Sequence, residues 1–393
     1  MGKRKSERDA QPAEAELPLA KYLSSTEKRV RDRAIRSLAA FLLQSTHRGG
    51  LTIPPLELSR LWKGIFYCYW MSDKPLVQQA LAQELAGLVL AVAGAAPAGP
   101  EPTLPGKQAA AGAHAREGRA TELDAGPHTA DEQAADEPRS RERALAALDF
   151  YQGFWLTMEA EWLGVDKFRV DKYYALMRRY LYTGFCLLRM HSWDSVVVER
   201  FVSIMRGTNG PLSSNNLRVP DSITYHVCDL YLPELERAVE GTISGEDAAA
   251  RPAPLPVIAL LRPFIELAAT TQSKKVYTRA MDSVVTVFLD ACKSFMRITS
   301  ALDAPPSRKR PRSCAEDEER VDALASVIAC MAGEGDDEGD ADDASREHGE
   351  EMARVASVFR DALRAVLEIA SAPHAYAPRR KRLYALWQGE QTP

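Results

Sequence analysis

Large apolar residues recur at spacings of three and four along most of this 393-residue chain. Residues 25–44 show the pattern clearly, with Ile35, Leu38 and Leu42 on one side of a helical projection. That period matches the buried face of an α-helix. The period of two that is typical of a strand is nearly absent from the sequence. The pattern therefore predicts an all-α fold.

The same period predicts a succession of helices joined by turns or polar inserts. The expected helices cover residues 25–44, 56–71, 73–93, 142–163, 168–191, 194–206, 220–239, 255–271, 274–299, 319–332, 346–371 and 379–388. The helices recur without a fixed sequence period, which favours degenerate repeats over regular ones. We therefore expect antiparallel helix pairs stacked as a HEAT-like α-solenoid with disordered inserts.

Shifts in composition divide the chain into segments. Residues 94–139 are rich in Ala, Gly, Pro and Glu, and such a stretch buries too little apolar surface to offset its ordering entropy. A shorter insert is expected at 207–219. The expected division is a disordered basic N-terminus (1–16), first helical repeats (17–93), a disordered insert (94–139), helical repeats (140–300), a disordered linker with a basic cluster (301–319), and C-terminal helices (320–388) interrupted by an acidic loop (333–344).

Composition also restricts the compartment and the class of protein. The six cysteines are scattered and form no CxxC pair, which favours a reducing compartment. The first residues include no apolar signal segment, and the run Leu85–Ala96 is shorter than the roughly 18–20 residues that a membrane span needs. We expect a soluble intracellular protein that has no contact with a membrane.

Sequence motifs for catalysis or metal binding are weak in this chain. His226 and Cys228 are two residues apart, but a closed zinc site needs a second pair of ligands. Cys186 and Cys292 lie in apolar helical stretches and are interpreted as small core residues. We predict a protein that is not an enzyme, with no catalytic residue, metal, cofactor or small-molecule substrate.

The first helical segment is basic. Residues 17–93 contain ten Lys and Arg against five Asp and Glu, although the whole chain has a net charge of −4. Two interpretations stay open for these cations, namely contact with RNA phosphates or acidic partner surfaces, and an ordinary solvated face with internal ion pairs. The residues predicted to bind RNA or an acidic partner are Lys28, Arg29, Arg31, Arg33, Arg36, Lys63 and Lys74.

Two further basic clusters differ in their surroundings. The cluster of Arg308, Lys309, Arg310 and Arg312 lies in the expected linker and is predicted to be a nuclear-import signal. Residues 379–382 precede an apolar run, which favours a docked helix over a signal.

Aromatic residues are unusually dense in the segment 61–79. Five aromatic side chains within ten residues exceed what one buried helical stripe needs, so some of them are expected to reach a neighbouring element or a partner. Core packing and partner docking both stay open for these side chains. The residues predicted to dock a partner are Trp62, Tyr67, Trp70 and Asp73.

The same segment carries a resemblance to a known family. Its Leu-Trp-Lys-Gly-Ile-Phe-Tyr and Trp-Met-Ser-Asp-Lys-Pro strings closely resemble the signature of the ribosomal RNA-processing protein 1 family. The resembling strings lie at Val30–Ala34, Leu61–Tyr67, Trp70–Pro75, Phe154–Met158, Arg169–Arg179 and Ile223–Leu232. The insert 94–139 and the acidic stretch 333–344 depart from the family pattern.

The resemblance implies a non-catalytic helical scaffold in the nucleus and nucleolus. Members of that family act in the pre-60S particle and are needed to process the precursor rRNA of the large subunit. The implied partners are pre-60S assembly factors, among them Brix-domain and WD-repeat proteins, and precursor rRNA bound directly or through those proteins. The competing interpretation is a cytoplasmic helical-repeat adaptor that binds only proteins.

Overall fold

The computed structural model describes residues 19–47, 53–95, 130–214, 216–243, 254–302, 313–333 and 341–391, and all regular elements in these ranges are helical. This confirms the all-α fold. The helices are α1 (Leu19–Leu23), α2 (Lys28–His47), α3 (Pro55–Trp70), α4 (Pro75–Val92), α5 (Ala130–Glu161), the 3₁₀ helix η1 (Trp162–Gly164), α6 (Val170–Met190), α7 (Ser195–Arg206), α8 (Asp221–Ile243), α9 (Val257–Thr270), α10 (Lys274–Ala280), the π-helix η2 (Met281–Val285), α11 (Thr286–Leu302), α12 (Ser313–Asp322), α13 (Ala325–Ala332), α14 (Ala341–Ser371) and α15 (Ala377–Gln391).

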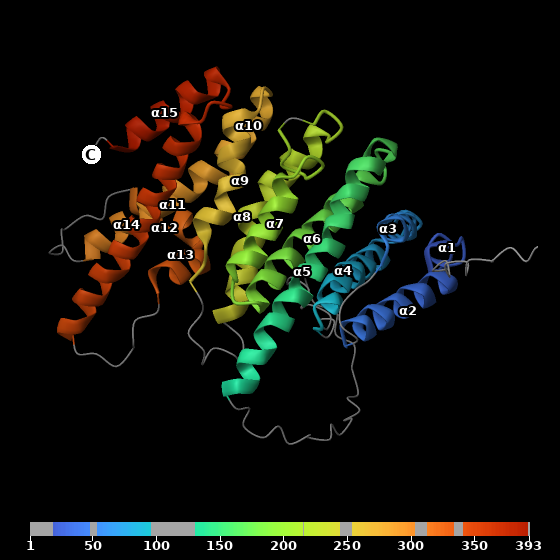
Figure 1. Cartoon of the computed structure of the whole chain (residues 1–393). Coiled ribbons are helices and arrows are strands. Elements are labelled where there is room, and N and C mark those ends of the chain that lie inside the picture. Colours follow the sequence, from blue (N-terminus) through green and yellow to red (C-terminus); the bar gives the residue numbers. More distant parts are fainter. Residues whose placement is uncertain are drawn as a thin grey trace, which may run out of the picture.

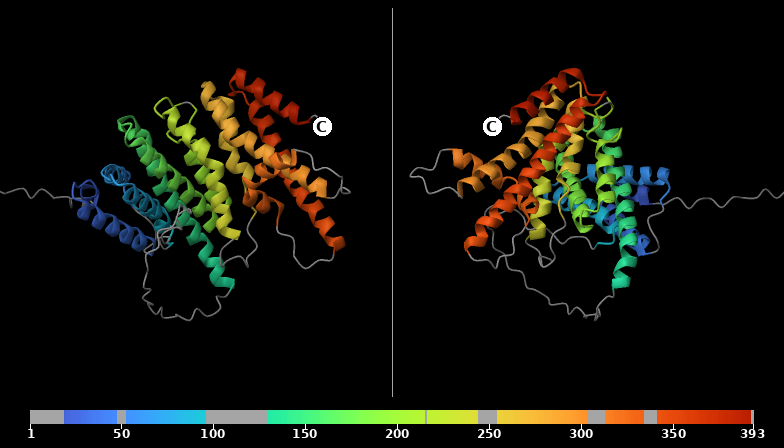
Figure 2. Two further views of the ribbon diagram at one scale, coloured as in Figure 1. Left: turned by 180° about the vertical axis from the view of Figure 1, so that it is seen from behind. Right: turned by 60° about the vertical axis from the view of Figure 1, so that its left-hand side comes forward.

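The helices up to α10 form two layers in one elongated row (Figures 1 and 2). In one layer α1 contacts α3, α3 contacts α5, and the series continues through α7 to α9. The even-numbered helices α2, α4, α6, α8 and α10 contact one another in the same order. This arrangement is compatible with the expected HEAT-like α-solenoid, in which each repeat packs only on its neighbours.

The C-terminal helices depart from that order. Helix α9 packs against both α14 and α15, and α13 packs between α8 and α14. The long helix α14 lies beyond α9 at the C-terminal end of the row (Figure 2). The later helices cover the apolar surface that the last regular repeat would leave exposed.

Three helices begin earlier than the sequence predicts. Helix α5 begins at Ala130, within the expected insert 94–139, α12 begins at Ser313, within the expected linker, and α14 begins at Ala341, within the expected acidic loop. These starts are rich in Ala, Glu and Asp but lack large apolar residues. The lack of large apolar residues predicted no helix there, but an Ala-rich segment can form a helix without a large apolar face. Residues 1–16, 96–129, 303–312 with the cluster 308–312, and 334–340 lie outside the described residues.

The predicted insert 207–219 is a folded loop wherever it is described. Leu212 is only 3% exposed, and its amide donates to the Met205 carbonyl oxygen at 2.9 Å. The Thr224 hydroxyl donates to the Pro211 carbonyl oxygen at 2.8 Å. The expectation of disorder was wrong here because one buried leucine and local hydrogen bonds fix the loop.

An aromatic cluster joins the two layers near the first repeats. The rings of Phe154 and Tyr180 stack with centroids 3.8 Å apart, and the Trp62 ring lies 4.7 Å from that of Phe150. A Cβ atom at Gly153 would lie 2.1 Å from the Trp62 indole nitrogen. Helices α3 and α5 therefore approach closely only because position 153 has no side chain.

Helix α4 is an apolar core helix in this fold. By length and composition alone it is apolar enough to cross a membrane. Its Leu85 and Val89 side chains are fully buried, and the helix contacts α2, α5 and α6. The hydroxyl of Tyr180 also donates to the Leu85 carbonyl oxygen at 2.9 Å. The apolar character of α4 is thus accounted for by packing inside the array.

Candidate RNA- and partner-binding surface

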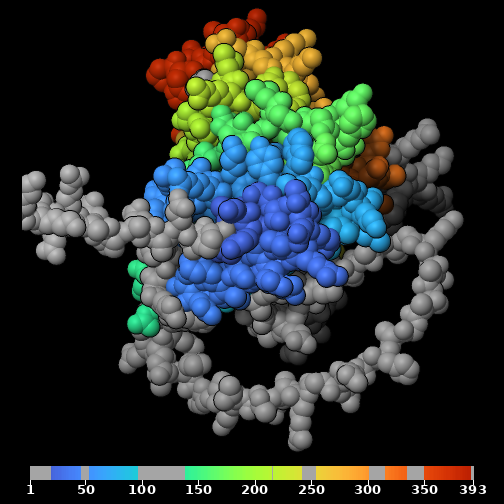
Figure 3. Space-filling model, turned by 90° about the vertical axis from the view of Figure 1, so that its right-hand side faces the viewer, coloured from blue at the N-terminus to red at the C-terminus, as the bar shows by residue number. Residues whose placement is uncertain are grey.

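Helix α2 lies at one end of the array and turns its outer face to solvent (Figure 3). Its Ile35, Leu38 and Leu42 side chains are fully buried, which directs the basic residues away from the core. On the exposed side, the Lys28 ammonium lies 2.6 Å from an Asp32 carboxylate oxygen. The Arg36 guanidinium donates to the Asp32 carbonyl oxygen at 3.3 Å. Lys28, Asp32 and Arg36 thus form one row along the exposed side of α2.

That row is largely occupied by internal charge pairing. Burial and the nearby Asp32 carboxylate raise the pKa of Glu84 on α4, whereas Arg36 and Lys28 act in the opposite direction. Lys28 and Arg36 thus face carboxylates of their own chain. Arg29 and Arg33 are exposed, and within the described part of the chain neither is paired with a carboxylate. These two arginines therefore offer exposed positive charge on α2 that no described carboxylate offsets.

Arg31 is the exception among the predicted RNA-binding residues. Its side chain is 7% exposed, and the guanidinium donates to the carbonyl oxygens of Ser25 and Thr26, each at 2.9 Å. The same group lies 3.5 Å from the Met71 carbonyl oxygen after α3. The prediction that Arg31 binds RNA was wrong, because its charge is used to join the α1–α2 turn to the end of α3.

Lys63 and Tyr67 converge on the end of α5. The Lys63 ammonium lies 2.9 Å from one Glu161 carboxylate oxygen, and the Tyr67 hydroxyl donates to the other at 3.1 Å. The hydrogen bond to Glu161 raises the pKa of Lys63, and partial burial raises the pKa of Tyr67. Lys63 is exposed but already paired, so its binding role stays a prediction.

Trp62 belongs to the core, not to a docking surface. It is 2% exposed and forms part of the floor of a groove of about 570 Å³ between α3 and α5. The prediction that Trp62 docks a partner was wrong, because the indole is covered by α5. Trp70 is half-buried beneath the Arg169 guanidinium, 4.6 Å from its ring, while Asp73 and Lys74 are exposed in the α3–α4 turn.

A buried lysine from α6 closes the end of α3. The Lys172 ammonium donates to the carbonyl oxygens of Tyr69 at 3.0 Å, Trp70 at 2.7 Å and Ser72 at 2.8 Å. The Tyr69 hydroxyl returns a hydrogen bond to the Lys172 carbonyl oxygen at 2.9 Å. Burial, followed by the nearby Arg169 charge, lowers the pKa of Lys172 to about 8. The cation satisfies carbonyl groups that a helix end leaves free.

Similar contacts continue along one edge of the array. The Trp162 indole donates to the Ser222 hydroxyl at 3.0 Å, and the Ser273 hydroxyl donates to Asp221 at 3.3 Å. The Arg379 guanidinium then donates to the Thr271 carbonyl oxygen at 3.2 Å. We call this the turn edge. It consists of the turns at residues 24–27, 71–74, 162–169, 207–220, 271–273 and 372–376 (Figure 1).

The basic cluster at the start of α15 also contributes to helix ends. Arg379 is 5% exposed and bonds the carbonyl groups of Thr271 and Gln272 after α9. Arg380 donates to the carbonyl oxygens of Ala370 at 3.0 Å and Ala372 at 2.9 Å, at the end of α14. This confirms the interpretation of residues 379–382 as the start of a docked helix.

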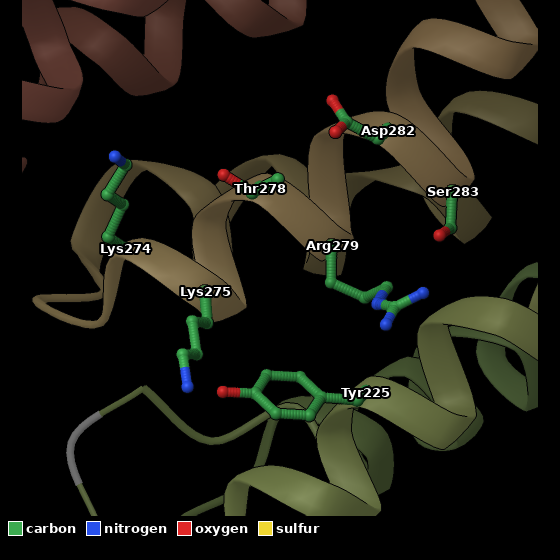
Figure 4. A pocket seen from close by; sticks show the side chains of 7 residues that line it. All are labelled: Tyr225, Lys274, Lys275, Thr278, Arg279, Asp282 and Ser283. Carbon is green, nitrogen blue, oxygen red and sulfur yellow. The ribbon is translucent and has the colours of Figure 1, made fainter.

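A pocket of about 530 Å³ lies between α8 and α10 on the same edge. Figure 4 shows Lys275 and Arg279 on the side of α10 that faces Tyr225, and Lys274 pointing away. The Arg279 guanidinium lies 3.1 Å from Asp229, and the Tyr225 hydroxyl donates to Asp221 at 3.0 Å. The Arg279 charge in this pocket is thus balanced by Asp229 of α8.

The candidate metal ligands are separated by the fold. The His226 ring nitrogen lies 3.0 Å from the Tyr174 carbonyl oxygen, whereas Cys228 is fully buried and burial raises its pKa to about 12. In the part of the chain that the structure describes, no three His, Cys, Asp or Glu residues gather as a metal site. Cys292 is likewise fully buried, which confirms its interpretation as a core residue.

Comparison with known sequences assigns this arrangement to a family. The family model described as "Nucleolar protein, Nop52" matches residues 14–355. This range includes α2, the aromatic segment of α3 and Lys172, which bonds the carbonyl groups at the end of α3. The chain belongs to the Nop52 family.

Curated relatives carry a consistent name. Ribosomal RNA processing protein 1 homolog B of Homo sapiens is 29% identical over 259 residues, which are 66% of this chain and 26% of that protein. The homolog A of Mus musculus is 27% identical over 275 residues, which are 70% of this chain and 43% of that protein. The homolog of Drosophila melanogaster is 25% identical over 274 residues, which are 69% of this chain and 30% of that protein. The chain thus matches less than half the length of each of these relatives.

Sequence reasoning missed the residues that hold the Nop52 signature segments together. Lys172 and Arg169 lie in one resembling string, and the residues that they contact lie in another, about a hundred positions earlier. Gly64 was also missed, although a Cβ atom there would lie 2.9 Å from the Ala20 carbonyl oxygen of α1. The available signal was the presence of Lys172 beside two tyrosines and of Gly64 within an aromatic-rich helix.

Proposed function

We propose that this protein is a non-catalytic scaffold in the nucleolus that takes part in processing the precursor rRNA of the large ribosomal subunit. The observation that carries the proposal is the Nop52 match over residues 14–355. The names of the curated relatives support a role in ribosomal RNA processing. The pre-60S particle and its Brix-domain and WD-repeat proteins, taken from the resemblance, are the proposed surroundings and partners.

The geometry supports a scaffold because positions along the array are firmly held. Helix ends on the turn edge are closed by charged side chains from neighbouring helices, as Lys172 does for α3. Large aromatic side chains such as Tyr173 and Tyr180 are fully buried between the layers. A stiff array of this kind presents separate surfaces at fixed distances, which suits the assembly of several components.

Direct contact with precursor rRNA is proposed for the exposed arginines of α2. Arg29 and Arg33 are exposed, one turn apart on the helix and unpaired with carboxylates in the described residues. Guanidinium groups in that state bind phosphates through charge and paired hydrogen bonds. Lys74 on the turn edge is proposed as an additional phosphate contact, and Asp73, Tyr67 and Trp70 stay proposed partner contacts. The cluster 308–312 is proposed as the nuclear-import signal.

The test is crosslinking of the tagged full chain to RNA in cells of its own host. The variant carries Arg29→Glu and Arg33→Glu, and the control carries Arg360→Glu and Arg364→Glu on α14, which are also exposed. We expect crosslinks on large-subunit precursor rRNA that are lost in the α2 variant and kept in the control. Cytoplasmic location with no precursor rRNA in the purified complexes would overturn the proposal in favour of a protein-only adaptor.

A further inference from the structure

Three large apolar side chains project into solvent from the turn edge. Leu163 is 86% exposed, Phe168 is 83% exposed, and Leu217 is fully exposed at 103%. Leu163 and Phe168 lie in the connection between α5 and α6, and Leu217 lies in the loop before α8. Such side chains are costly to hydrate, and a group of them on one edge is typical of an interaction surface.

The connection between α5 and α6 is packed against the start of α8. The Trp162 indole, next to Leu163, donates to the Ser222 hydroxyl at the start of α8. Trp162 also contacts the Tyr174 ring at 5.4 Å, and that ring lies 4.2 Å from His226 on α8. The turn that carries Leu163 and Phe168 is therefore docked on the helix into which the loop with Leu217 leads. All three side chains therefore lie on turns that adjoin the start of α8.

Both connections contain the same kind of turn, in which a side-chain oxygen accepts a hydrogen bond from the amide two residues later. The Asp166 side chain accepts from the Phe168 amide at 2.9 Å, and the Asn216 side chain accepts from the Arg218 amide at 3.0 Å. The Asn216 amide group also donates to the Thr208 carbonyl oxygen at 3.0 Å. Turns closed in this way restrict the backbone before any partner arrives. Binding through them needs little additional ordering.

Positive charge borders the apolar side chains. The Lys167 ammonium lies 5.1 Å from the centre of the Phe168 ring, and Arg218 follows Leu217 directly in the chain. Both cations are exposed, and within the described residues neither is paired with a carboxylate. The nearby Asp166 is paired with Arg169. The exposed Asp171 on the first turn of α6 offsets only part of this charge.

We propose that Leu163, Phe168 and Leu217 form a docking surface for a partner protein with an apolar cleft bordered by Asp and Glu. The apolar side chains would enter the cleft, and Lys167 and Arg218 would face its acidic border. A protein fits better than RNA because leucine offers bases no surface for stacking, whereas it fills an apolar cleft well. The inference rests on the proposed scaffold role and names the chemistry of one partner.

The test places a photoreactive benzoylphenylalanine at position 168 in one full-length variant and at position 217 in another. A third variant carries it at position 56, since Leu56 is exposed at 63% on the first turn of α3, away from the turn edge. The variants are crosslinked in cells of the host, and the adducts are mapped by mass spectrometry. We expect positions 168 and 217 to crosslink the same protein, at apolar residues flanked by Asp or Glu, and position 56 not to crosslink it.

Charge reversal completes the test. Adding Lys167→Glu and Arg218→Glu lowers the yield of that adduct by about fivefold or more, because like charges then face each other across the border. Adducts to RNA or lipid, the same adduct from position 56, or no adduct at all would each overturn the inference. If precursor rRNA remains associated while the adduct is absent, only this inference fails. If the rRNA is lost and the adduct persists, only the proposed RNA contact fails.

Discussion

The basic starts of α2 and α15 look alike in sequence but use their charge differently. In α15 the guanidinium groups of Arg379 and Arg380 bond carbonyl oxygens at the ends of α9 and α14. In α2 only Arg31 is used in this way, and Arg29 and Arg33 stay exposed. The difference follows from the neighbours, because a helix end lies within reach of α15 but not of the outer face of α2. A run of basic residues therefore indicates nucleic-acid binding only after its structural contacts are known.

The two uses of positive charge also differ in how much they stabilise the fold. A charged donor that satisfies buried carbonyl groups contributes about 1.5–3 kcal/mol per bond. An exposed ion pair contributes about 0–1 kcal/mol and weakens with salt. We call a cation clamped when it bonds carbonyl groups at a helix end, as Lys172 does. Clamped cations should therefore contribute to the free energy of unfolding, whereas exposed cations such as Arg29 should contribute to the binding of RNA. The predictions below test this difference between clamped and exposed cations.

The largest effect is expected at Lys172. Lys172→Met keeps most of the side-chain volume but removes the ammonium donor to the carbonyl groups of Tyr69, Trp70 and Ser72, of which Tyr69 and Ser72 keep other donors. We expect the free energy of unfolding to fall by about 3 kcal/mol, measured by urea denaturation. Lys167→Met, at an exposed position five residues earlier, should change it by less than about 0.5 kcal/mol. Equal losses in the two variants would contradict the distinction between clamped and exposed lysines.

A smaller loss is expected at Arg379. Arg379→Ala removes the donor to Thr271 and Gln272 together with the guanidinium that covers the Tyr277 ring at 4.6 Å. The expected loss is about 2 kcal/mol, seen as a lower melting temperature in calorimetry. Lys381→Ala, an exposed neighbour in α15, is the matched control and should melt close to the wild type. A variant at Arg379 that melts like the control would show that α15 is held by other contacts.

The burial of Lys172 should also make the free energy of unfolding depend on pH. The pKa of Lys172 is lowered from its ordinary value of 10.5 to about 8 in the folded chain. Between these two values the unfolded chain binds more protons than the folded chain, so this group makes stability rise with pH. The contribution is constant below about pH 8, where both states carry the proton.

The measurement compares the free energy of unfolding of the wild type and of Lys172→Met at pH 7.5 and pH 9.5. The three carbonyl acceptors favour the charged amine and oppose the effect of burial. We therefore expect the advantage of the wild type to grow by about 1 kcal/mol, less than the full linkage of about 1.4 kcal/mol per pH unit over this interval. If the wild type is more stable than Lys172→Met by the same amount at both pH values, the carbonyl groups keep the Lys172 amine protonated in the folded chain.

The smallest effect on stability is expected for the exposed arginines of α2. Arg29→Glu with Arg33→Glu should change the free energy of unfolding by less than about 0.5 kcal/mol per site, because neither side chain is buried. The same variant should lose precursor rRNA in the crosslinking test. Arg31→Glu should do the reverse in vitro, with a clear loss of stability, because its carbonyl partners would then face a carboxylate. Loss of folding in the Arg29/Arg33 variant would refute the assignment of these residues to binding.

Local features of the fold could be predicted well from the sequence. The expected helices 25–44 and 56–71 correspond to α2 (Lys28–His47) and α3 (Pro55–Trp70). Side chains separated by three or four residues lie on one face of a helix whatever the rest of the fold does, and this makes the apolar period informative. Insert boundaries were less accurate, because an Ala-rich segment such as the start of α5 forms a helix without burying large side chains.

The roles of individual candidate residues were harder to predict. Trp62 was assigned both to the core and to docking, and only the approach of α5 at Gly153 decides for the core. Arg31 has the same residue type and exposed-helix surroundings in sequence as Arg29 and Arg33. Its partner at Met71 lies 40 positions away. A pattern of neighbouring residues in the sequence cannot show a contact between residues that far apart in the chain.

Residue types and their spacing were enough to predict the all-α fold, the order of the helices and, through the signature strings, membership in the Nop52 family. These properties depend on residue type and local spacing. Tertiary structure alone decided which cations are clamped and which are free, and that three apolar side chains share one edge. The physical reason is that helix-end carbonyl groups and exposed side chains acquire their neighbours only when distant segments pack together. The bonds from Lys172 to residues 69–72 span about a hundred positions of the chain.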